Sequence, residues 1–98
     1  MEKLKILEIK MLRGEILKAL FNVYPRGLKE STLKKAFIGN YMNIDVERQL
    51  EYLRGPGKEY IIVTDDEEDC PEDILVKLSP KGYDLIDGSI DADPGIAF

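Results

Sequence analysis

The Gly55-Pro56-Gly57 segment divides the chain into two parts that differ in hydrophobic periodicity. Before it, apolar residues recur at intervals of three and four, which is typical of helices that bury one face. After it, two short runs rich in β-branched and aromatic residues, 60–64 and 74–78, are typical of strands. This division predicts an α+β fold that is mainly α, with helices first and a small β-hairpin after them.

Three helices are predicted before the break, over residues 2–24, about 29–38 and about 45–54. The first part of residues 2–24 is ambiguous, because apolar residues there alternate with Lys3, Lys5, Glu8 and Lys10, which also suits a strand. Gly14 lies inside the first helix and predicts a bend or a break, because glycine costs a helix ~1 kcal/mol. Pro25 ends that helix, since the residue before a proline is disfavoured in the α region.

The third helix has two candidate caps, Asn43 and Asp45, whose side chains can accept a hydrogen bond from the first helical turn. After the strands, Ser79-Pro80 predicts a cap followed by proline at the first position of a short closing helix, which Gly88 ends. Residues 93–98 are expected to form a turn with an apolar end that packs on the rest of the chain.

The two strands are expected to pair as an antiparallel hairpin. The segment between them, residues 65–73, holds seven acidic residues in nine and is too polar to be buried. Charge is also distributed unevenly along the whole chain. Residues 1–58 carry twelve Lys or Arg and seven Asp or Glu, a net of +5, whereas residues 59–98 carry two and twelve, a net of −10. Such an asymmetry points to a basic and an acidic surface with different roles.

At 98 residues the chain is expected to form one domain, 1–98. It has no apolar run long enough to cross a membrane. A single cysteine, Cys70, cannot form an internal disulfide, which favours the reducing cytoplasm. The chain has no histidine, the commonest general base and metal ligand, and its serines therefore have no such base to activate them. We expect neither an enzyme nor a metal or cofactor site.

The order of three helices, a hairpin and a closing helix resembles the winged-helix variant of the helix-turn-helix domain. The resemblance lies in residues 31–38 (STLKKAFI), 46–53 (VERQLEYL) and 76–86 (VKLSPKGYDLI). The last of these is similar to the "L-T-x-K-G" exit from the wing in many bacterial regulators. The resemblance as a whole covers about residues 13–88. It implies a three-helix core, a wing and a C-terminal helix, with an N-terminal extension 1–12 and a tail 89–98.

A narrower resemblance is to small ArsR-like winged-helix proteins of Mu-like prophages. Those proteins have "R-x-L-D-Y-L" in the third helix and a "D-P-G-I-A" tail, which are similar to RQLEYL at 48–53 and DPGIA at 93–97 here. This resemblance implies a DNA-binding transcriptional regulator.

In a helix-turn-helix, the second helix of the motif enters the major groove and the preceding one crosses the DNA backbone. The resemblance therefore implies that helix 45–54 reads bases. An arginine can bond a guanine edge through two hydrogen bonds, and Asn or Gln can do so with adenine. Gln49 is alternatively expected at the flank of the apolar stripe that the third helix buries. The candidate DNA-binding residues are Lys34, Lys35, Asn43, Arg48, Gln49, Arg54 and Lys58.

A protein-interaction module on the same scaffold is the alternative. Asp45, Glu47 and Glu51 accompany the two arginines of the third helix, so its outer face is close to neutral, and an acidic wing would repel phosphates. In this alternative, the wing binds a protein with a basic surface, unless its charge serves only solubility. The candidate partner-binding residues are Asp65, Asp66, Glu67, Glu68 and Asp69.

The first helix carries one further feature, an apolar stripe formed by Leu4, Leu7 and Met11. A single core of this size cannot fully cover it. We expect either a homodimer through the N-terminal helix, or packing of the stripe on the chain's own core or on residues 96–98.

Overall fold

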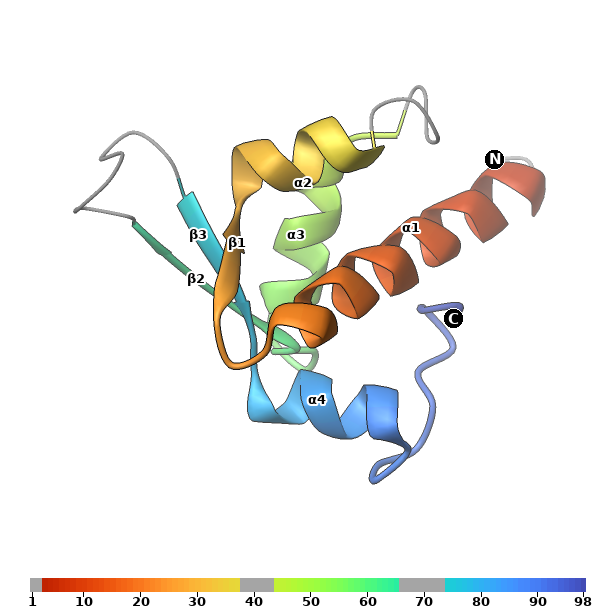
Figure 1. The fold of residues 1–98 in the computed structure, drawn as a ribbon. Helices are drawn as coiled ribbons and strands as arrows, with labels where there is room; N and C mark the ends of the chain where they lie inside the picture. Colours follow the sequence, from red (N-terminus) through yellow and green to blue (C-terminus); the bar gives the residue numbers. More distant parts are fainter. Residues whose placement is uncertain (1–2, 38–43, 66–73) are drawn as a thin grey trace.

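Four helices and a three-stranded sheet make up the part of the chain that the computed structural model describes, residues 3–37, 44–65 and 74–98. The chain therefore has an α+β fold, as predicted (Figure 1). In chain order the elements are α1 (Lys3–Val23), β1 (Gly27–Lys29), α2 (Glu30–Phe37), α3 (Val46–Arg54), β2 (Ile61–Asp65), β3 (Ile74–Leu78) and α4 (Pro80–Asp87).

The predicted helix ends are confirmed where a local signal defines them. Asp45 caps α3, because its side chain accepts a hydrogen bond from the backbone N–H of Arg48 at 3.4 Å. Ser79 caps α4 by accepting from the N–H of Gly82 at 3.0 Å, and Gly88 ends that helix in the left-handed conformation, with φ of 86°. Asn43, the other candidate cap of α3, lies outside the described residues.

β1 is a strand that the sequence analysis missed, since it assigned Lys29 to the second helix. The sheet is antiparallel with the order β1-β3-β2, so β3 is the central strand. Gly27 pairs with Lys77, and a Cβ at Gly27 would lie 2.4 Å from the backbone oxygen of Val76. Pairing with β3 thus keeps these residues extended, and α2 begins only at Glu30. The predicted hairpin of β2 and β3 is confirmed.

Gly14 does not bend or break α1, contrary to the prediction. The helix is continuous from Lys3 to Val23, and the C-terminal tail crosses it at Gly14. The backbone N–H of Ala97 donates to the oxygen of Lys10 at 3.0 Å, and a Cβ at Gly14 would lie 1.9 Å from the oxygen of Ala97. Glycine is required here because the two backbones approach so closely.

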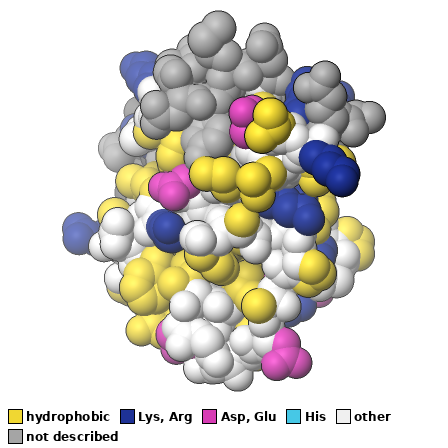
Figure 2. Space-filling model, turned by 90° about the vertical axis from the view of Figure 1, so that its right-hand side faces the viewer, with side chains coloured by type: hydrophobic (Ala, Val, Ile, Leu, Met, Phe, Trp, Pro, Cys, Tyr) yellow, Lys and Arg dark blue, Asp and Glu magenta, His cyan; other side chains and the backbone are white. Residues whose placement is uncertain are grey.

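The first two turns of α1 extend past the other elements, and residues 3–8 are all exposed (Figure 1). The C-terminal end of the chain lies on the same side of the molecule. Figure 2, which views this side, shows hydrophobic side chains gathered across it among scattered Lys and Arg. None of the described helices is long and apolar enough to span a membrane.

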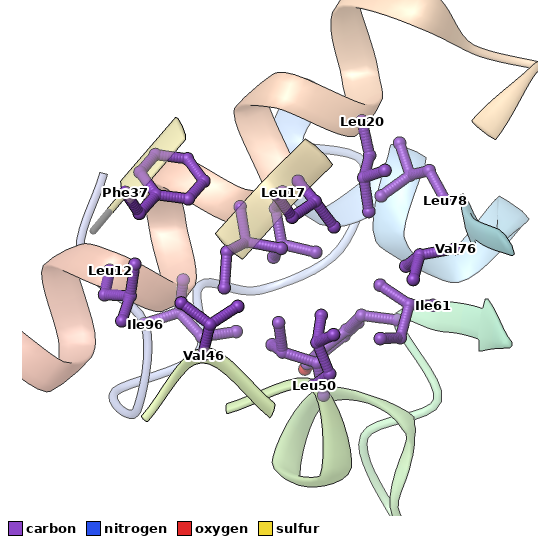
Figure 3. Close-up of a cluster of buried hydrophobic side chains, with 14 of the residues drawn as sticks. Leu12, Leu17, Leu20, Phe37, Val46, Leu50, Ile61, Val76, Leu78 and Ile96 are labelled. Atoms are coloured by element: carbon purple, nitrogen blue, oxygen red, sulfur yellow. The ribbon is translucent and has the colours of Figure 1, made fainter. Parts of the chain in front are cut away.

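One hydrophobic core joins all the elements. Side chains from helices and strands converge on the same centre, with Leu17 from α1, Leu50 from α3 and Val76 from β3 among them (Figure 3). Ile96 of the C-terminal tail is buried in this cluster, which confirms that the apolar end of the chain packs on the rest. Its members are Leu12, Ile16, Leu17, Leu20, Leu33, Phe37, Val46, Leu50, Leu53, Tyr60, Ile61, Val76, Leu78, Leu85 and Ile96.

Candidate nucleic-acid interface

The exposed surface of α2 and α3 contains most of the charged side chains that the sequence analysis singled out. Helix α3 buries Val46, Gln49, Leu50 and Leu53, so its solvent side presents Glu47, Arg48, Glu51 and Arg54. Helix α2 packs beside α3 (Figure 1), and its two lysines are exposed. We call this surface the α2–α3 face; its charged residues are Glu30, Lys34, Lys35, Glu47, Arg48, Glu51 and Arg54.

Two cations of the α2–α3 face are paired with the chain's own carboxylates. Lys34 Nζ lies 2.9 Å from a carboxylate oxygen of Glu30 and 3.7 Å from one of Glu47, so it links α2 to α3. The hydrogen bond to Glu30 is the main cause of the raised pKa of Lys34. Arg54 Nε lies 3.5 Å from a carboxylate oxygen of Glu51. Exposed pairs of this kind contribute at most about 1 kcal/mol to stability, and here they satisfy the charge of Lys34 and Arg54 within the face.

Arg48 and Lys35 are the cations of the α2–α3 face that form no ion pair with another described residue. Both side chains are exposed, and neither has a carboxylate within 4.0 Å among the residues that the structure describes. The backbone N–H of Arg48 is used in the cap of α3, but its guanidinium is not. Of the predicted base-reading residues, Arg48 is therefore the one that the described structure leaves available to a ligand. Asn43 lies outside the described residues.

Gln49 does not lie on this face, so its assignment as a DNA contact is wrong for this structure. Its side chain is only 4% exposed, and its Oε1 accepts a hydrogen bond from Arg13 Nε at 2.8 Å. The amide thus lies between α3 and α1 rather than toward solvent. The alternative placement of Gln49, at the flank of the buried stripe, is the one that the structure confirms.

Lys58 was also predicted to contact DNA, and the structure holds it elsewhere. Its Nζ donates to Asp93 Oδ2 at 2.8 Å and lies 5.2 Å from the centre of the Tyr52 ring. The hydrogen bond to Asp93 is the main cause of the raised pKa of Lys58. This lysine therefore contributes to attachment of the tail and is not a free cation.

Asp93 is the centre of a polar cluster that the sequence analysis did not find. Its carboxylate accepts hydrogen bonds from Lys58, from the Tyr60 hydroxyl at 2.7 Å and from the N–H of Gly95 at 2.7 Å. Burial raises the pKa of Asp93, but these donors outweigh burial and hold it at about 2. Burial and the hydrogen bond to Asp93 raise the pKa of Tyr60 to about 12.

Arg13 joins this cluster to α1. Its guanidinium lies 3.5 Å from the centre of the Tyr52 ring and donates to the backbone oxygen of Gly95 at 3.1 Å. Among the described side chains, no buried nitrogen or oxygen lacks a hydrogen-bond partner. The buried polar atoms of the cluster are therefore satisfied within the chain, and the cluster attaches the tail. The only sequence signal for it is the DPGIA segment, which says nothing about these partners.

The acidic segment lies largely beyond what the structure describes. Asp65 is the last residue of β2, and Asp66, Glu67, Glu68 and Asp69 lie outside the described residues. Within residues 3–37, 44–65 and 74–98, no group of three or more acidic, histidine or cysteine side chains is placed to hold a metal ion.

No protein-family model, no curated protein and no solved structure matches this chain. What the chain can bind must therefore be argued from the α2–α3 face itself.

Proposed function

We propose that this protein is a winged-helix DNA-binding protein, a transcriptional regulator that reads duplex DNA with α3. In this proposal α2 and α3 form the helix-turn-helix, the β2–β3 hairpin is the wing and α4 is the C-terminal helix. The order of these elements supports it, together with the resemblance of the sequence to winged-helix regulators, including the ArsR-like proteins of Mu-like prophages.

The observation that carries the proposal is the position of Arg48. Helix α3 is fixed to the core by a fully buried Leu53 and by Leu50, which is 4% exposed, and it presents Arg48 on the opposite, exposed side. A rigid helix with a free guanidinium can enter a major groove and bond the O6 and N7 atoms of guanine together.

The charge of the α2–α3 face sets how strongly salt should affect binding. Four cations and three carboxylates give this face a net charge of +1. Among the described residues, Arg48 and Lys35 are the two cations of the face without a carboxylate as ion-pair partner. If these two side chains displace counterions, the slope of log affinity against log salt is about −1.8. Recognition then depends on few contacts, and α3 must supply most of the discrimination between sequences.

Selection from a random duplex library at low and moderate salt would find the preferred site, and two alanine variants would then test the face. We expect Arg48→Ala to weaken binding to the selected site about ten- to a hundredfold, because a bidentate base contact is lost. Lys34→Ala is the matched control, since its charge is already satisfied by Glu30 and Glu47, and it should weaken binding less than about threefold.

Both side chains are exposed, so neither substitution should change the free energy of unfolding by more than about 0.5 kcal/mol. Equal losses for the two variants, or a library from which no duplex is enriched, would contradict the proposal.

A protein-interaction module is the second candidate function, because the net charge of the α2–α3 face is small for a DNA-binding surface. In that case the acidic segment captures a protein with a basic surface. Changing its carboxylates to amides should abolish capture of such a partner, and should not weaken DNA binding if the first proposal holds. The residues to change are Asp65, Asp66, Glu67, Glu68 and Asp69.

A further inference from the structure

The N-terminal end of α1 carries an apolar stripe that no described part of the chain covers. Leu4, Leu7 and Met11 are 71%, 48% and 43% exposed. Their spacing of three and four residues places them on one side of the helix, away from the side on which Ile16 and Leu20 are fully buried. Figure 2 views the side of the molecule where this end of the helix emerges.

The C-terminal tail continues this stripe. The next position at the same spacing is Gly14, which has no side chain, and the tail occupies the space beside it. A Phe98 ring carbon lies 3.4 Å from where a Cβ of Gly14 would be, and Phe98 is 55% exposed. Two segments far apart in the sequence thus combine into one exposed apolar surface, whose residues are Leu4, Leu7, Met11 and Phe98. We call it the α1 stripe.

The first turns of α1 make little contact with their own core, because residues 3–8 are exposed on all sides. These turns continue a helix that is fixed to the core further along, but their own apolar side gains no packing from the described residues. The spacing of the α1 stripe is that of a coiled coil, with Leu4 and Met11 at position a of the heptad and Leu7 at position d. A second helix of the same kind would pack Leu7 against an equivalent residue.

Charges beside the α1 stripe select both the partner and its direction. Lys3 and Glu8 occupy the g and e positions on opposite flanks of the stripe, and neither has an ion-pair partner among the described residues. In a parallel pair, position g of one helix faces position e of the other. Lys3 of each copy then pairs with Glu8 of the other copy, which gives two equivalent ion pairs. An antiparallel pair would instead bring the two copies of Glu8 together.

We propose that the α1 stripe binds a second copy of this chain, forming a parallel two-fold dimer through residues 3–11 with Phe98 at its edge. The proposal does not depend on DNA binding. The contact spans few helical turns, less than a standard interface, so the dissociation constant of the dimer should be micromolar or higher.

Sedimentation equilibrium of the full chain over a range of concentrations tests this dimer. The wild type should show a monomer–dimer equilibrium, and Leu7→Ser should be monomeric throughout. Glu8→Lys should weaken the dimer about tenfold, because two attractive pairs become repulsive, and the double variant Lys3→Glu/Glu8→Lys should restore the wild-type dissociation constant. Circular dichroism would verify that these exposed substitutions leave the fold unchanged.

Two results would overturn the proposal. A wild type that is monomeric at every concentration would leave the α1 stripe to some other protein. A Glu8→Lys chain that associates with the wild type more tightly than either chain does with itself would indicate antiparallel pairing.

Discussion

Asp93 shows how much of the fold one residue can hold together. Its carboxylate is buried, yet it is charged, because Lys58, Tyr60 and the N–H of Gly95 donate to it. Such a group is costly to bury alone and favourable only when its hydrogen bonds are complete. The tail therefore depends on a polar anchor as well as on the apolar contacts of Ile96.

We expect Asp93→Asn to lower the free energy of unfolding by about 2 kcal/mol at neutral pH. The pKa of Asp93 is held at about 2 in the fold, below its ordinary 3.8. Its stabilising effect is therefore present above about pH 4 and is lost as the pH falls toward 2. Denaturant unfolding of the two proteins at neutral pH and near pH 2 measures this, and the difference between them should fall to well below half at the lower pH.

Asp91→Asn is the control for this measurement, because Asp91 is an exposed carboxylate of the same tail. It should leave the free energy of unfolding almost unchanged at both pH values. A difference between wild type and Asp93→Asn that is the same at both pH values would mean that packing, and not charge, anchors the tail.

Residue-level predictions from the sequence succeeded only where spacing alone decided the outcome. The exposure of Arg48 follows from its place among the buried positions of α3. The ion pair of Lys58 with Asp93 could not be predicted, because Asp93 is 35 residues away and reaches Lys58 only once the tail has packed. Gln49 was ambiguous for a similar reason, since its partner Arg13 comes from another helix.

At the scale of elements, the tail and α1 constrain each other at Gly14. The tail backbone occupies the space into which any larger side chain at this position would project. Glycine is therefore tolerated inside a long helix at a cost in helix propensity, because the close contact with Ala97 offsets that cost.

Gly14→Ala should accordingly destabilise the full chain, although the same change normally stabilises a helix by about 1 kcal/mol. The new Cβ would displace Ala97 and with it the buried Ile96. In a chain without residues 93–98 the sign should reverse, and the substitution should raise the free energy of unfolding. Thermal unfolding of the four proteins measures both effects, and stabilisation in both backgrounds would contradict this account of the contact.

Elements with local signals were predicted and those without were missed. The ends of α3 and α4 follow from caps that lie within four residues of the groups they bond. β1 has no such signal, because its three residues are extended through pairing with β3, about fifty positions later. Sequence periodicity indicates the secondary structure that a segment favours in isolation, whereas β1 is extended because it pairs with β3.

At the scale of the whole molecule, the charge is divided between a basic first part of the chain, which includes the α2–α3 face, and an acidic second part. The net charge of −5 describes neither surface, since residues 1–58 carry +5 and residues 59–98 carry −10. A duplex bound by α3 must therefore meet Arg48 and Lys35 while staying clear of the carboxylates beyond β2. This arrangement favours an association that is steered by few cations and is sensitive to salt.

The salt dependence of DNA binding tests the central claim most directly. Fluorescence anisotropy with the selected duplex should give a slope of log affinity against log salt of about −1.8, and about −0.9 for Lys35→Ala. A slope that does not change when Lys35 is removed, or an affinity that does not depend on salt, would contradict the claim that the α2–α3 face binds DNA.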